Sequence, residues 1–109
     1  MNLHIEWTPI AQQSLREVYI YTMEKFGRRQ LLKLTSKIYA ATRRIAAMPE
    51  SGKREAEMTD ATGVEYRSTI VIKELKLIYT LTNGTVTIEF VKNARMSNAT
   101  MLLKLRDNT

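Results

Sequence analysis

The chain has 109 residues and a formal net charge of +6, and it contains no cysteine. This length suits one domain and is too short for two cores, and the lack of cysteine excludes disulfides and thiolate metal sites. The first residues show no basic segment followed by an apolar one, and no stretch approaches the roughly 20 apolar residues of a membrane span. We therefore expect one domain over residues 1–109, located in the cytoplasm and away from membranes.

The positive charge is concentrated in one segment. Between Lys25 and Arg54, nine Lys or Arg side chains face a single acidic residue, Glu50. Such a local excess favours a polyanionic or acidic partner, whether RNA, DNA or an acidic protein segment. It is equally compatible with a charge that only keeps the protein in solution, so composition leaves both interpretations open.

The first half of the chain predicts one strand and two helices. Residues 3–7 alternate apolar and polar, as in a short half-buried strand. Thr8 and Pro9 have the pattern of a helix N-cap followed by proline at the first helical position. Apolar residues then recur at helical steps as far as Phe26, and Gly27 predicts a left-handed stop. A second helix follows, with an apolar seam at alternating steps of three and four: Leu31, Leu34, Ile38, Ala41, Ile45 and Met48.

Four cations share one flank of this second helix, about 100° round from the apolar seam. They are Arg29, Lys33, Lys37 and Arg44. A solvated helix face is the commoner explanation of such a stripe, and a binding surface is the alternative.

The second half of the chain predicts three antiparallel strands. Residues 50–63 are polar and predict a loop, and from Tyr66 to Val91 apolar residues alternate with polar ones. Lys73-Glu74 predicts a tight turn. Asn83-Gly84 predicts a hairpin, because both residues tolerate the positive φ of a type I′ turn. With two-residue turns the predicted pairs are Leu81–Val86, Tyr79–Ile88 and Leu77–Phe90 in one hairpin, and Tyr66–Leu81, Ser68–Tyr79 and Ile70–Leu77 in the other.

These pairs put the apolar side chains on one face of the sheet, where both helices cover them. The opposite face is polar, rich in threonine and predicted to be uncovered. The fold class is therefore α+β, with the order β-α-α-β-β-β: an antiparallel sheet with a two-helix hairpin packed on one face.

The sequence offers little of the usual catalytic chemistry. The one histidine, His4, stands near the start of the chain, no carboxylates have metal-binding spacing, and no glycine-rich phosphate loop is present. We therefore expect neither a metal nor a cofactor. Strand parity places Arg67, Lys76 and Arg95 on the open sheet face, where they would bind phosphate or an acidic protein surface. The alternative for Arg67 is a surface ion pair with Glu89, which contributes little.

Several short segments, in this order, resemble the RelE/ParE toxin superfamily. They are Trp7-Thr8-Pro9, Met48-Pro49-Glu50-Ser51-Gly52, Tyr66-Arg67-Ser68, Leu77-Ile78-Tyr79 and Phe90-Val91-Lys92-Asn93-Ala94-Arg95. The resemblance runs from about Ile5 to Leu103. It implies a growth-arresting toxin of a type II toxin–antitoxin module of the kind that stabilises plasmids, with a core at about residues 3–95 and a tail at 96–109. The implied partners are a cognate antitoxin and, only through the antitoxin, operator DNA.

The superfamily contains two activities. RelE-like members cleave mRNA on the ribosome, and Arg67, Lys76 and Arg95 match basic positions of that catalytic site. Thr69 stands where a further lysine is expected, and Met101 falls near the catalytic tyrosine, although methionine cannot transfer a proton. We therefore favour a ParE-like inhibitor of DNA gyrase, which needs no such residue. A ribosome-dependent endoribonuclease and an inactive member that only binds its antitoxin remain alternatives.

Overall fold

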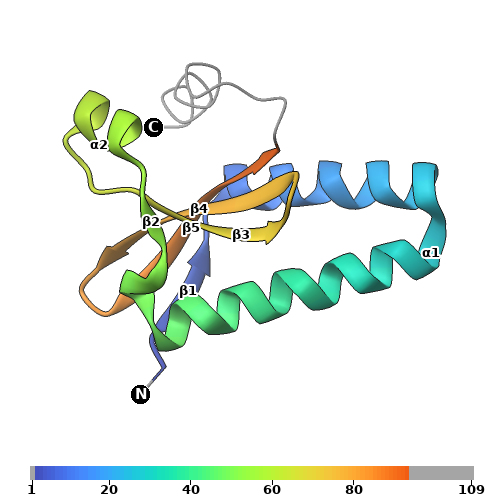
Figure 1. Ribbon diagram of the computed structural model, residues 1–109, viewed down its shortest axis with the longest axis horizontal. Helices are drawn as coiled ribbons and strands as arrows, with labels where there is room; N and C mark the ends of the chain where they lie inside the picture. The colour runs from blue at the N-terminus through green and yellow to red at the C-terminus, as the bar shows by residue number, and fades with distance from the viewer. Residues whose placement is uncertain (1, 94–109) are drawn as a thin grey trace.

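The computed structural model of the protein describes residues 2–93 (Figure 1). The chain starts with β1 (His4–Trp7) and continues into the long helical element α1 (Pro9–Ala47). A connecting region follows, made of the 3₁₀ turn η1 (Pro49–Ser51), β2 (Lys53–Arg54) and α2 (Ala56–Thr62). Three longer strands complete the fold: β3 (Arg67–Ile72), β4 (Leu75–Thr82) and β5 (Thr85–Asn93).

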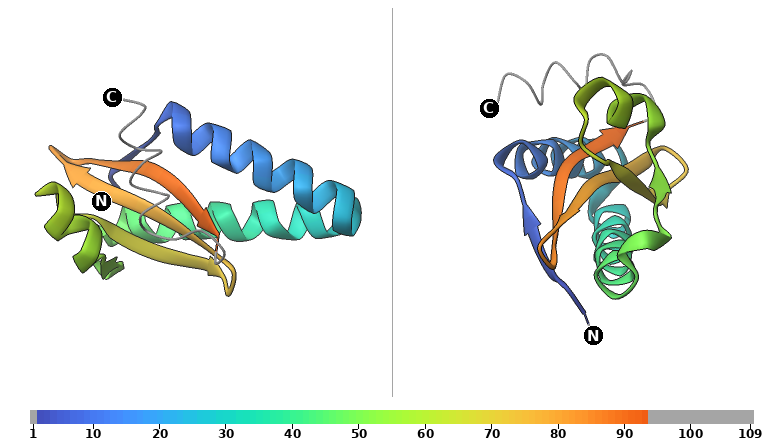
Figure 2. Two further views of the ribbon diagram at one scale, coloured as in Figure 1. Left: turned by 90° about the horizontal axis from the view of Figure 1, so that it is seen from above. Right: turned by 90° about the vertical axis from the view of Figure 1, so that its left-hand side faces the viewer.

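The element α1 is a hairpin of two helical arms, residues 9–26 and 28–47, which lie side by side and antiparallel (Figures 1 and 2). The side chain of Thr8 caps the first arm, because its Oγ1 accepts a hydrogen bond of 3.0 Å from the backbone N–H of Ala11. Gly27 breaks the helix with φ 85° and ψ 178°, a conformation that glycine adopts at little cost. The predicted N-cap, helix pair and glycine stop are confirmed.

The five strands form one sheet in the order β1-β5-β4-β3-β2. β1 runs parallel to β5, with Ile5 opposite Val86, and the other neighbours are antiparallel. The α+β class is thus confirmed, and β1, the two arms of α1 and the three long strands follow one another in the predicted order β-α-α-β-β-β, with β2 and α2 inserted before β3. The predicted sheet was purely antiparallel, whereas the observed sheet is mixed because β1 is parallel to β5. The loop predicted at residues 50–63 is wrong, since this segment contains β2 and α2.

The hairpin between β4 and β5 has the predicted turn. Asn83 and Gly84 have φ of 50° and 77°, as a type I′ turn requires. The pairs Leu81–Val86 and Tyr79–Ile88 are also as predicted. A β-bulge then follows, so Ile78 lies opposite Phe90 and Leu77 opposite Val91. The predicted pair Leu77–Phe90 is therefore wrong, because Glu89 is an extra residue on β5.

A second bulge changes the register between β3 and β4. Ile72 lies opposite Leu75, so Lys73-Glu74 is the predicted two-residue turn. The register then shifts between Ile70 and Ile72, which leaves Val71 as the extra residue. The observed pairs beyond it are Ile70–Lys76, Thr69–Leu77, Ser68–Ile78 and Arg67–Tyr79. All three predicted pairs of this hairpin are wrong, because a slip of one residue moves every side chain to the other face.

Both faces of the sheet are consequently covered. The larger core lies between the sheet and α1, and its buried residues are Ala11, Leu34, Ile38, Ala41, Ile45, Leu75, Leu77, Tyr79, Val86, Ile88 and Val91. On the other face Met58 of α2 packs with Ile78 and Phe90, and all three are at most 1% exposed. The prediction of an uncovered face is wrong, because it treated the segment before β3 as a loop. In residues 2–93 no helix is long and apolar enough to span a membrane.

Candidate functional site

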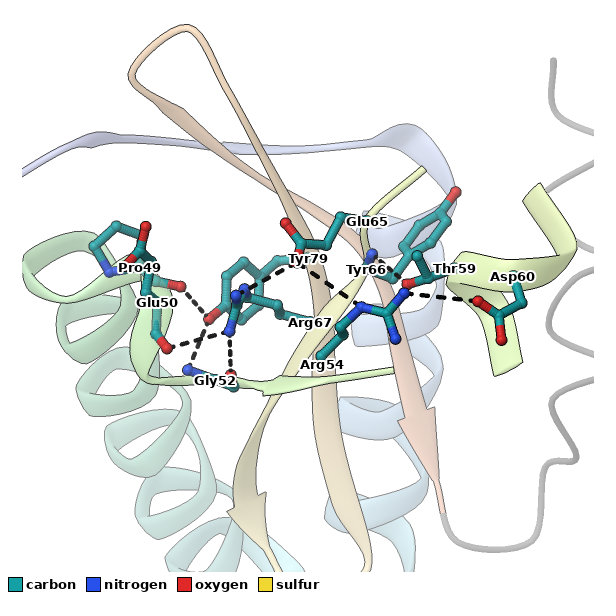
Figure 3. A network of polar contacts seen from close by, with 10 residues as sticks. All are labelled: Pro49, Glu50, Gly52, Arg54, Thr59, Asp60, Glu65, Tyr66, Arg67 and Tyr79. Carbon is teal, nitrogen blue, oxygen red and sulfur yellow. Dashed lines mark hydrogen bonds and ion pairs between the residues drawn. The ribbon is translucent and has the colours of Figure 1, made fainter. Parts of the chain in front are cut away.

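Tyr79 and Arg67 fasten the turn after α1 to the sheet (Figure 3). The buried Tyr79 hydroxyl donates to the carbonyl of Pro49 at 2.6 Å and accepts from the N–H of Gly52 at 3.1 Å. Arg67, opposite Tyr79, donates from Nη1 to the carbonyls of Glu50 and Gly52 at 3.2 and 2.9 Å. The Arg67 guanidinium is therefore engaged in holding the backbone of residues 49–52.

The close packing here explains the glycine at position 52. A Cβ atom on Gly52 would collide with the Tyr79 hydroxyl and lie 2.8 Å from the carbonyl oxygen of Ser68. Burial raises the pKa of the Tyr79 hydroxyl, and the hydrogen bond from Gly52 and the charge of Arg67 offset this only in part. The phenol therefore keeps its proton and acts as a donor to Pro49, so its role is structural.

We expect Tyr79→Phe to lower the free energy of unfolding by about 2 kcal/mol, because the Gly52 N–H and the Pro49 carbonyl lose a buried partner. Urea denaturation would measure the change. Tyr39→Phe is the matched control, since Tyr39 is 63% exposed and an exposed substitution changes stability by about 0.5 kcal/mol or less. Equal effects of the two substitutions would show that the hydroxyl of Tyr79 does not stabilise the turn.

A second polar cluster lies on the opposite face of the sheet, at the start of α2. The carboxylate of Glu55, with 9% of its side chain exposed, accepts at Oε2 from Ser68 Oγ at 2.6 Å and from Lys76 Nζ at 3.0 Å. The neighbouring strand contributes Lys92, which lies opposite Lys76. Lys76 is thus committed to an ion pair that joins β4 to α2.

The charges in this cluster depend on each other. Burial by itself raises the pKa of Glu55, but the hydrogen bonds from Ser68 and Lys76 and the charges of Lys76 and Lys53 outweigh it, so the pKa is lowered. Burial lowers the pKa of Lys92, and the nearby charge of Lys76 lowers it further. Glu55 is therefore ionised at neutral pH and neutralises part of the local positive charge.

The predicted cationic site on one open face is not assembled. Arg67 lies on the α1 side of the sheet with Tyr79, whereas Lys76 lies on the α2 side with Glu55. The cause is the bulge in β3, which the two-residue turn geometry did not include. The alternative pairing of Arg67 with Glu89 is also wrong, because Arg67 pairs with Glu65 at 3.4 Å. Arg95 lies outside the described residues.

The four cations predicted on the second helix fall into two groups. Arg44 reaches the sheet and donates from Nη2 to the Thr69 hydroxyl at 2.6 Å and to the Ile70 carbonyl at 3.1 Å. The other three, Arg29, Lys33 and Lys37, are exposed along the same arm. Thr69, where a catalytic lysine would be expected, is thus a partner of Arg44.

Sequence reasoning missed Glu55 and Gly52 because it read residues 50–63 as a loop. One usable signal was Gly63, which ends α2 in the left-handed conformation with φ 77°. Another was Met58, the apolar residue in a polar segment that enters the smaller core. Within residues 2–93 no three His, Cys, Asp or Glu side chains gather as a metal site would require.

The fold and these contacts define a small basic α+β protein in which Arg44, Arg67 and Lys76 serve structural contacts. The chain matches the family model described as "ParE toxin of type II toxin-antitoxin system, parDE" over residues 5–97. A search of curated proteins gives no match. A solved structure of the chromosomal ParDE TA system from P. aeruginosa has a similar fold, with a TM-score of 0.67 and 14% identity over 84% of this chain and 95% of that chain. The chain therefore belongs to the ParE toxin family of type II toxin–antitoxin systems.

Proposed function

We propose that this toxin acts by binding and inhibiting DNA gyrase and that a cognate antitoxin silences it. The observation that carries the proposal is the separation of Arg67 and Lys76 on opposite faces of the sheet. Each is engaged in structural contacts, Arg67 with the carbonyls of Glu50 and Gly52 and Lys76 with Glu55. A toxin that works by occupying its target does not need these cations to converge.

The alternative, a ribosome-dependent nuclease, requires such convergence. Phosphoryl-transfer sites stabilise the charge of the transition state with cations aimed at one phosphate. In the described part of the chain, the two cations assigned to that role are held apart by the sheet, and Lys76 faces a carboxylate at 3.0 Å. A carboxylate in this position repels a phosphate, which argues against cleavage at this place.

The activity can be tested by inducing the toxin in cells and reading out three results in parallel. Gyrase inhibition predicts growth arrest with DNA double-strand breaks and a DNA-damage response, and the purified chain should inhibit supercoiling by gyrase. Messenger RNA cuts positioned by the reading frame would overturn the proposal in favour of the nuclease. Absence of growth arrest would instead identify an inactive member that only binds its antitoxin.

The edge of the sheet beyond β2 offers a place for the antitoxin. β2 pairs only with Arg67 and Ser68 of β3, so the rest of β3 has a neighbouring strand, β4, on one side and none on its outer edge in the described structure. Here Ile70 is 67% exposed, and its carbonyl accepts from Arg44. An extended partner segment can add to such an edge through main-chain hydrogen bonds. The basic character of the chain favours an acidic segment, with a carboxylate that pairs with Arg44.

We expect Arg44→Gln to slow association with the antitoxin several-fold at low salt and to weaken the dependence of the on-rate on salt, because steering by a charge is screened. Surface plasmon resonance over a salt series would measure both. Arg43→Gln, which removes an equal charge one residue away, is the control. An on-rate and an affinity of the wild type that do not change between low and high salt would contradict an electrostatic role.

A further inference from the structure

Three exposed cations, Arg29, Lys33 and Lys37, form a row along the second arm of α1, which is coloured cyan to green in Figure 1. None of them makes an ion pair with a carboxylate among residues 2–93. They differ in this from Arg44, which is held by the sheet. Within residues 2–93, the Arg67, Lys76 and Arg44 cations make structural contacts, whereas this row has no partner of opposite charge.

The three cations of the row are evenly spaced, and the residues beside them have small side chains. Successive cations are four residues apart, which places them about 6 Å apart along a helix that rises about 1.5 Å per residue. Two small residues, Ser36 and Ala40, lie on the same side of the arm as the row. The large apolar side chains exposed on this arm, Leu32 and Tyr39, lie about 100° or more round the helix from Lys33.

A shallow hollow lies beside the row, near the start of the arm. Its volume is about 650 Å³, and it is lined by Arg28, Arg29, Leu32, Lys33 and Ser36. Three of these side chains are cationic, one is a hydroxyl donor and none is acidic. Guanidinium, ammonium and hydroxyl groups at this hollow can donate hydrogen bonds to phosphate oxygens, and most of the remaining lining surface is apolar.

We propose that this row, with the adjoining hollow, binds the sugar–phosphate backbone of double-stranded DNA. An evenly spaced row of cations, which winds only about 80° round the helix from first to last, matches a stiff polyanion. Single-stranded nucleic acid is bound by cations combined with aromatic stacking platforms, and the row contains no aromatic residue. An acidic protein would bring apolar anchors to the centre of its interface, whereas this side of the arm carries the three cations with the small Ser36 and Ala40, and the apolar Leu32 lies at its edge.

The contact is independent of sequence, because it involves phosphates and no base edges. It also differs from an indirect association with operator DNA through an antitoxin, since the toxin itself touches the duplex. The proposal does not depend on which enzyme the toxin inhibits.

The test uses the purified full-length chain and a short DNA duplex of arbitrary sequence, with binding followed by fluorescence anisotropy between about 50 and 200 mM salt. Each phosphate neutralised contributes about 0.9 to the slope of log K against log salt. We expect the triple variant Arg29→Gln, Lys33→Gln and Lys37→Gln to make this negative slope shallower by about 2.7. It should also weaken binding more than tenfold at the lowest salt. Its thermal unfolding should match the wild type, because all three side chains are exposed.

The matched control removes the same total charge from other exposed positions, with Arg16, Lys53 and Lys73 changed to Gln. This control should keep the slope of the wild type within about one unit. An equal loss in the two triple variants would overturn the proposal, because net charge alone would then explain binding. Displacement of the duplex by polyglutamate as effectively as by unlabelled DNA would also overturn it and would assign the row to an acidic protein.

Discussion

The substitution Glu55→Gln is expected to lower the free energy of unfolding at neutral pH by about 2 kcal/mol. The carboxylate is nearly buried and accepts hydrogen bonds from Ser68 and Lys76. Removing one member of such a pair leaves the other charge without compensation, which costs about 3–5 kcal/mol in a fully buried pair. The expected cost is smaller here because 28% of the Lys76 side chain is exposed. Chemical denaturation of the two proteins at pH 7 would measure it.

The same pair gives a testable pH dependence. The pKa of Glu55 is lowered in the folded protein, so the unfolded chain binds a proton first as the pH falls. The stabilisation by the carboxylate is therefore fully present above the ordinary pKa of glutamate, about 4.3, and it is lost as the pH falls through the lower folded value. The difference in stability between wild type and Glu55→Gln should thus persist at pH 7 and shrink below about pH 4.3.

Two further variants isolate the pair. Glu74→Gln, in an exposed turn, removes an equal charge and should change stability by about 0.5 kcal/mol or less. The double variant Glu55→Gln with Lys76→Met should be more stable than Glu55→Gln alone, because the ammonium left without its carboxylate is gone. Lys76→Met alone completes the comparison. If the double variant is less stable than the wild type by the full sum of the effects of Glu55→Gln and Lys76→Met, the pair contributes no coupling energy.

The elements that local chemistry specifies could be predicted from the sequence. Thr8 caps a helix through its own hydroxyl, Gly27 stops one with its positive φ, and Asn83-Gly84 closes a hairpin for the same reason. Each signal lies within a few residues of the structure that it specifies. They were sufficient for the order of the main elements and the fold class.

The register of β3 and the placement of the cations could not be predicted in this way. A bulge adds one residue to one strand, and two-residue turns alone contain no information about it. The bulge in β3 lies at three successive apolar residues, Ile70-Val71-Ile72, where alternation fails. The bulge at Glu89 of β5 lies within the regular alternation Ile88-Glu89-Phe90, and alternation fails only beyond it, at Phe90-Val91. On the face that α2 covers, Ile78 and Phe90 are also buried. Here the apolar and polar residues therefore do not separate into a buried face and a solvent-exposed face, which is the pattern that normally specifies strand register.

The double variant Glu55→Gln with Lys76→Met also distinguishes gyrase inhibition from ribosome-dependent mRNA cleavage, and the expected difference in activity is large. It removes the Lys76 cation without leaving Glu55 as an unpaired buried carboxylate, so loss of folding does not obscure the result. We expect the variant to inhibit gyrase supercoiling within about threefold of the wild type, because Lys76 serves the ion pair with Glu55. A nuclease that used Lys76 on its phosphate would lose about a hundredfold in rate.

The matched comparison is deletion of residues 96–109, a segment outside the described residues that we expect to contribute to target contacts. Titration of each purified variant against gyrase, with mapping of mRNA 5′ ends after induction, gives the two measurements. If the proposal holds, the deletion weakens inhibition more than the double variant does, and no cuts follow the reading frame. A double variant that abolishes toxicity while its thermal unfolding matches the wild type would contradict the structural assignment of Lys76. In that case the cation must act on the target, and the pair with Glu55 would have to open when the toxin binds.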